Sequence, residues 1–122
     1  MREEKTMHFD ELVVNAIFKE LFDENSARYK QSLKKTINND NDVYAKARNA
    51  LAKLSDPDKD QILMFIDMVI ADSAATILGT LDGTHYPDNI QHDFKLIYNN
   101  EEIQGNLQDL FIEKAEDKGV YG

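Results

Sequence analysis

Residues 62–81 constrain the fold more than any other part of this sequence. Apolar residues recur there at helical spacing and leave little of the circumference polar. The stretch is long enough to cross a membrane, yet it contains Asp67 and Asp72, each of which costs a few kcal/mol at a bilayer centre. We therefore interpret it as a buried helix of a protein that does not enter the membrane.

Flanking residues set the limits of that helix. Ser55 is suited to cap its first turn, and Pro57 lies where a missing N–H costs little. Gly79 and Gly83 supply the backbone freedom for a stop and a turn. The pattern predicts a long helix over about 57–78, in the middle of a bundle with the other helices laid against it.

The rest of the chain predicts shorter elements. Helical spacing favours helices over 9–22, from Ser26 to about residue 37, and from Asn41 or Asp42 to about Ser55, with a polar break at 23–26. Alternation around Asn99-Asn100 predicts a small hairpin at about 94–104, and Asn106 is suited to cap a last helix that ends near Asp117. The expected fold is mainly α, a helical bundle around the central helix with one β-hairpin and a C-terminal helix.

With 122 residues, the chain is the size of a single domain, 1–122. It contains no cysteine, which excludes disulfides and thiolate chemistry and fits a reducing compartment. The segment 1–5 is charged and lacks the apolar core of a signal peptide. We expect a cytoplasmic protein.

The two carboxylates inside the apolar stretch invite a catalytic interpretation. Five positions apart on a helix, Asp67 and Asp72 point about 140° away from each other, so they cannot form a carboxylate pair by themselves. We expect at least one to face solvent or to bond a backbone N–H, a lysine or an arginine.

No phosphate-binding loop or nucleophile elbow occurs in the sequence. A polar segment at 82–93 could in principle ligate a metal or act in acid/base catalysis, although its histidines lack the spacing of known metal motifs. The residues of this alternative enzyme site are Asp82, His85, Asp88, His92 and Asp93. We predict instead no catalytic residue, no metal and no cofactor.

Charge is the strongest remaining indication of function. The formal net charge is −9, which argues against direct binding of nucleic acid. Residues 24–55 carry seven Lys or Arg against three Asp or Glu, whereas residues 80–122 carry three against nine. The acidic surface that residues 80–122 would form suits a basic protein partner. The predicted partner-binding residues are Asp82, His85, Asp88, Asp93, Glu101, Glu102 and Asp109.

Three segments carry a resemblance to a known kind of protein: Ile-Leu-Gly-Thr-Leu-Asp-Gly at 77–83, Phe-Lys-Leu at 94–96 and Ile-Gln-Gly-Asn-Leu-Gln-Asp-Leu-Phe at 103–111. Over about residues 77–117 the chain resembles small acidic bacterial immunity proteins, which accompany contact-dependent inhibition or other polymorphic toxins. The resemblance implies a cytoplasmic, non-enzymatic antidote that binds one cognate toxin domain, often a basic nuclease, and blocks its active site or substrate surface. It transfers no functional residue by position.

Two other functions remain open at this point. One is the small enzyme built on the 82–93 loop. The other is a structural homo-oligomer that uses whatever apolar surface the long helix leaves exposed. If the protein acts by binding a partner, we expect it to be a monomer or weak dimer that contacts neither a membrane nor nucleic acid directly.

Overall fold

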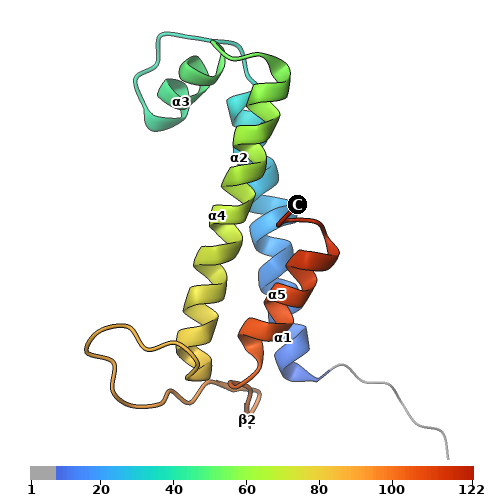
Figure 1. The fold of residues 1–122 in the computed structure, drawn as a ribbon, viewed down its shortest axis with the longest axis vertical. Helices are drawn as coiled ribbons and strands as arrows, with labels where there is room; N and C mark the ends of the chain where they lie inside the picture. The colour runs from blue at the N-terminus through green and yellow to red at the C-terminus, as the bar shows by residue number, and fades with distance from the viewer. Residues whose placement is uncertain (1–7) are drawn as a thin grey trace, which may run out of the picture.

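Two long antiparallel helical segments form the axis of the molecule (Figure 1). The computed structural model describes residues 8–122. The first segment joins α1 (Phe9–Lys19), η1 (Glu20–Ser26) and α2 (Ala27–Leu33), and the second is α4 (Asp56–Asp82). At one end lies α3 (Val43–Leu51); at the other lie β1 (Ile97–Tyr98), β2 (Glu101–Glu102) and the start of α5 (Leu107–Asp117). The expectation for residues 1–5 lies outside the described residues.

The predicted polar break at 23–26 is wrong. Backbone angles stay helical from α1 into α2, and the intervening Glu20–Ser26 is wound as a π-helix. Ser26 is not a cap: its side chain is buried, and its Oγ donates to Asp67 Oδ1 at 2.6 Å. A row spaced by four residues, Val14, Phe18, Phe22 and Ser26, faces the other helices. An α-helix of about 3.6 residues per turn would rotate this row away by about 40° per step. The π turn at Glu20–Ser26 has more than four residues per turn, so it rotates the row back and offsets the drift that builds up along α1.

The predicted long helix is confirmed, with ends that extend further than expected. Ser55 caps α4, because its Oγ accepts from the backbone N–H of Asp58 at 3.3 Å. Gly83, at φ 79°, ends the helix in the left-handed conformation. We had predicted that the helix stops at Gly79, but this residue lies inside α4. Helix α3 begins at the predicted cap, Asp42, and ends at Leu51 rather than near Ser55.

The hairpin is confirmed and is shorter than predicted, with two-residue strands that pair in antiparallel fashion. Asn99 and Asn100 form its turn, both with positive φ (49° and 66°), as the favoured two-residue hairpin turn requires. The last helix is also confirmed. Its cap differs from the prediction, because the side chain of Asn106 makes no capping bond.

The core lies where α1, α4 and α5 meet. From α4 it takes small residues and one leucine: Ala71, Ala75 and Leu78. They pack near the fully buried Leu107 and Phe111 of α5. At Gly79 the two helices approach so closely that an added Cβ would lie 2.7 Å from Gln108 Nε2. Small side chains on α4 therefore allow the close packing of α5.

Candidate functional site

The predicted partner-binding residues gather at one end of the molecule, here called the acidic end: the loop 83–96, the hairpin and the first turn of α5 (Figure 1). His85, Asp88 and Asp93 lie on the loop and are exposed. Glu101 and Glu102 form β2, and Asp109 lies in the first turn of α5; all three are exposed. The chain thus brings six of the seven predicted residues to one exposed end.

Asp82, the seventh, has a structural role. Its carboxylate accepts from the backbone N–H groups of Gly105 (2.6 Å), Leu107 (3.1 Å) and Gln108 (2.7 Å). It therefore caps α5 from the end of α4, in the place predicted for Asn106. Because Asp82 ties the two helices together, it holds the hairpin and α5 in position rather than presenting a free charge.

The loop 83–96 is anchored at its start. The N–H groups of Thr84 and His85 both donate to the carbonyl oxygen of Gly79, and Thr84 Oγ1 donates to Gln108 Oε1 at 2.9 Å. Further along, the Tyr86 hydroxyl donates to Asp93 Oδ1 at 3.3 Å. The negative charge of Asp93 raises the pKa of Tyr86 above its ordinary value.

The carboxylates of the acidic end are sparsely paired. Among residues 8–122, the one ion pair at this end joins Lys95 Nζ and Glu102 Oε1 at 4.0 Å, between well exposed side chains. Exposed pairs of this kind are worth little. Within the same described range, no three His, Asp or Glu side chains come together in a way that could hold a metal ion. These exposed carboxylates therefore leave most of the negative charge at this end without a cationic side chain beside it.

A second feature had entered only through the homo-oligomer alternative: a large part of α4 is uncovered. We call its exposed side, with Ile62, Phe65, Val69, Ser73 and Ile77, the outer face. Phe65 is 61% exposed and Ile77 is 62% exposed. The central position predicted for α4 is confirmed, but the helix is less buried than we expected, since α1–α2 and α5 cover only its inner face. By length and composition α4 could cross a membrane, and one third of its most apolar stretch is buried.

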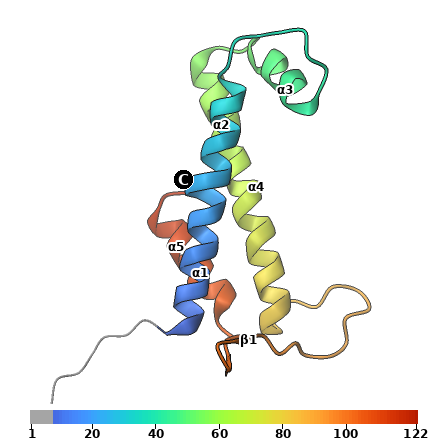
Figure 2. The same cartoon turned by 180° about the vertical axis from the view of Figure 1, so that it is seen from behind.

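A groove of about 460 Å³ runs beside the outer face, between α1–η1 and α4, and its whole lining is apolar apart from Ser73. We call it the outer groove, and Figure 2 shows the two helical segments that flank it, α1–η1 and α4, side by side. No residue of α5 lines it. The lining residues are Ile17, Leu21, Val69, Ile70, Ser73, Ala74, Ile77, Leu78 and Leu81.

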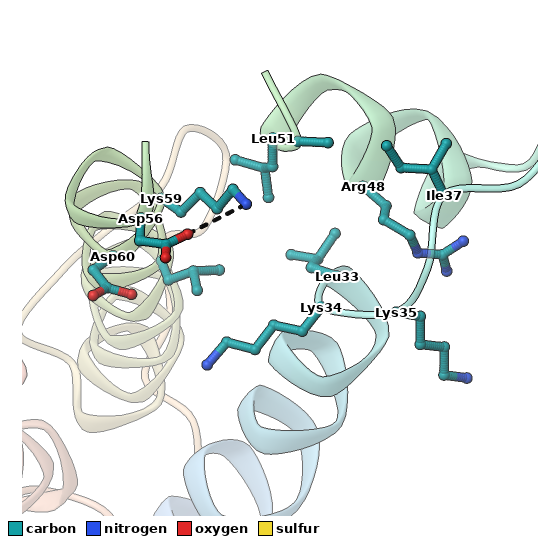
Figure 3. Close-up of a pocket in the computed structure, with 11 residues that line it drawn as sticks. Leu33, Lys34, Lys35, Ile37, Arg48, Leu51, Asp56, Lys59 and Asp60 are labelled. Carbon is teal, nitrogen blue, oxygen red and sulfur yellow. Dashed lines mark ion pairs between the residues drawn. The ribbon is translucent and has the colours of Figure 1, made fainter. Parts of the chain in front are cut away.

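A separate cleft, of about 400 Å³, lies at the opposite end between α2, α3 and α4 (Figure 3). Leucine side chains form part of its wall, and Lys34, Lys35 and Lys59 line it, with Lys59 Nζ 3.6 Å from Asp56 Oδ1. Arg48 is buried and donates from Nε to the carbonyl oxygen of Ser32 at 2.9 Å. This arginine joins α3 to α2, which gives it a structural role.

The two aspartates inside the apolar stretch have the predicted fates. Asp67 is half-buried and accepts from Ser26 Oγ and, through Oδ2, from Lys30 Nζ at 2.6 Å. Asp72 is exposed. Neither forms a carboxylate pair, and Asp67 serves to join α2 to α4.

Comparison of the chain with protein-family models, with curated proteins and with solved structures gives no match. The sequence shows apolar residues around most of α4, but it does not tell how many helices cover them, so the outer groove was missed.

Proposed function

We propose that this protein is a non-enzymatic, cytoplasmic inhibitor of the toxin-immunity kind. It binds a cognate protein toxin domain, a basic nuclease, and blocks the active site or the substrate surface. The observation that carries the proposal is the acidic end: six exposed predicted residues, five of them carboxylates, on elements fixed to the core. The resemblance over residues 77–117 supports the same function.

The way the acidic end is held strengthens the case. The Asp82 cap and the Asn99-Asn100 turn fix the backbone that carries Glu101, Glu102 and Asp109. A surface that is ordered before binding loses less conformational entropy when the partner docks. Its clustered negative charge also accelerates encounter with a positively charged partner. The nuclease's substrate is itself a polyanion, so an acidic surface suits competition for the same site.

The enzyme alternative has weaker support. His85 and His92 are exposed on the loop, and residues 8–122 offer no cluster of metal-ligating side chains. The homo-oligomer alternative is favoured by one observation, the exposed apolar side of α4.

The test is capture of the partner on the tagged chain, followed by an assay of nucleic-acid cleavage with and without a stoichiometric amount of the chain. We expect cleavage to be inhibited and the association rate to fall steeply as salt rises. A partner whose cleavage continues unchanged in the complex would contradict the proposal.

A pair of variants locates the docking surface. Glu101→Gln with Glu102→Gln removes two charges from the hairpin, and Glu113→Gln with Glu116→Gln removes two from exposed positions further along α5. We expect the hairpin variant to slow association about tenfold and the α5 variant to have a clearly smaller effect. Equal effects would show that net charge alone, rather than the acidic end, governs binding.

A further inference from the structure

The outer groove is an unfilled helix position. Helices α1, α4 and α5 pack around one core, and α5 occupies one side of the α1–α4 pair. On the other side the outer groove lies open, and Ile77 at its edge is 62% exposed. A row of side chains spaced by four residues, Val69, Ser73, Ile77 and Leu81, follows it along α4. Rows with this spacing form the ridges that pack against another helix.

The shape of the groove suits apolar anchors. Ser73 and Ala74 lie at its middle, and their short side chains leave room between the larger Val69 and Ile77. Two residues of the first long helix, Ile17 and Leu21, form the opposite wall. A helix that places apolar residues at every third or fourth position can seat them in such a groove.

The charged residues near the groove favour a bound helix that carries basic side chains. Glu20 and Glu24, both exposed, lie on η1 three residues after Ile17 and Leu21 respectively. Lys19, the nearest basic residue on the same helix, lines a different cleft, with Lys30 and Lys114. From residue 60 to residue 82, α4 has no lysine or arginine. Glu20 and Glu24 therefore make the α1–η1 side of the groove acidic, and the next basic residue along this helix, Arg28, lies one turn further on, in α2.

From these observations we infer that the outer groove binds a cationic amphipathic helix of the partner protein, with its apolar side chains in the groove and its basic flanks beside Glu20 and Glu24. This inference rests on the proposed function, because it assigns a second contact surface for the same basic partner. A second copy of this chain fits less well, since it would bring its own Glu20 and Glu24 to the same rim, where like charges repel.

The test uses two synthetic helical peptides with the same leucine face, one with lysine flanks and one with glutamate flanks. Binding to the full chain is followed by fluorescence anisotropy. We expect the lysine peptide to bind and the glutamate peptide to bind at least about tenfold more weakly. Equal binding of the two peptides would overturn the inference.

A matched pair of variants places the peptide. Ile77→Arg changes the groove, and Ile37→Arg makes the same change at a residue of similar exposure (57%) at the other end of the molecule. Both positions are exposed enough to keep the fold, which circular dichroism verifies. We expect Ile77→Arg to weaken binding of the lysine peptide about tenfold or more, and Ile37→Arg to leave it unchanged.

Three outcomes would overturn the inference. In one, Ile77→Arg leaves binding of the lysine peptide unchanged. In another, both arginine variants weaken it equally. In a third, sedimentation shows a dimer that Ile77→Arg dissociates, which would make a second copy the occupant. If the groove fails while Glu101→Gln with Glu102→Gln still weakens the cognate partner, the proposed function stands without this surface.

Discussion

The inner and outer faces of α4 use opposite kinds of residue. On the inner face, Ala71, Ala75 and Gly79 are buried and allow α5 to approach closely. On the outer face, Phe65 and Ile77 are large, apolar and exposed. Within this chain the inner face is a finished interface, whereas the outer face has the composition of an interface without its partner. The difference shows that hydrophobicity alone does not tell which side of a helix forms the core.

Variants at two neighbouring residues of α4 give the strongest test of the difference between its faces. Leu78→Ala empties a buried core position at the base of the outer groove, and we expect it to lower the free energy of unfolding by about 2–5 kcal/mol. Ile77→Ala truncates an exposed side chain one residue away and should change it by about 0.5 kcal/mol or less. Urea denaturation measures both. Similar losses would mean that the outer face is packed within the chain.

The inner face ends at Asp82, and its loss should have the next largest effect. Asp82→Ala leaves three backbone N–H groups at the start of α5 without their acceptor, so we expect a loss of about 2 kcal/mol. Asp109→Ala, in the first turn of α5 but exposed, should cost a few tenths of a kcal/mol. Thermal unfolding compares them, and equal shifts in Tm would count against the cap.

A smaller effect distinguishes the two aspartates inside the apolar stretch. Asp67→Ala removes the acceptor of the buried Ser26 hydroxyl and of Lys30, and we expect a loss of about 1 kcal/mol. Asp72→Ala, at an exposed position, should have almost no effect on stability. Urea denaturation of the two variants under the same conditions measures both free energies of unfolding. A larger loss of stability for Asp72→Ala than for Asp67→Ala would contradict the assignment of faces.

The smallest effect concerns the loop that follows α4. Asp93 raises the pKa of Tyr86 above 10.0, so Asp93→Asn should lower that pKa toward its ordinary value. Because the folded state holds the proton more tightly, the associated stability is present below pH 10.0 and is lost as pH rises through the raised pKa. Tyrosinate absorbance, with Tyr86→Phe subtracted, measures the shift. An unchanged titration would mean that the loop does not hold the two residues together.

Local signals in the sequence predicted much of the fold. Ser55 and Gly83 delimit α4 through their own backbone chemistry, and the Asn99-Asn100 turn determines the hairpin. Features that depend on residues far apart in the chain were missed. The polar run at 23–26 has a loop-like composition, yet Ser26 bonds Asp67, 41 positions away, and the helix continues. Likewise Asp82 caps a helix that begins 25 positions later.

The same reasoning explains which parts of the candidate site were predicted. Exposure of charged residues at 85–109 follows from their polarity, so the acidic end could be anticipated from composition. The outer groove could not, because it depends on how many helices are available to cover α4. A periodic apolar pattern predicts that a helix face is covered, without telling whether the covering helix comes from the same chain.

The most direct test of the central claim, that the outer face is built for a partner protein, is the heat-capacity change on binding. Calorimetric titration of the chain with the lysine-flanked peptide at several temperatures measures it. We predict a clearly negative value, because apolar surface is buried, and a marked reduction in Ile77→Arg but not in Ile37→Arg. A heat-capacity change near zero, or one that is equal in both variants, would contradict the account.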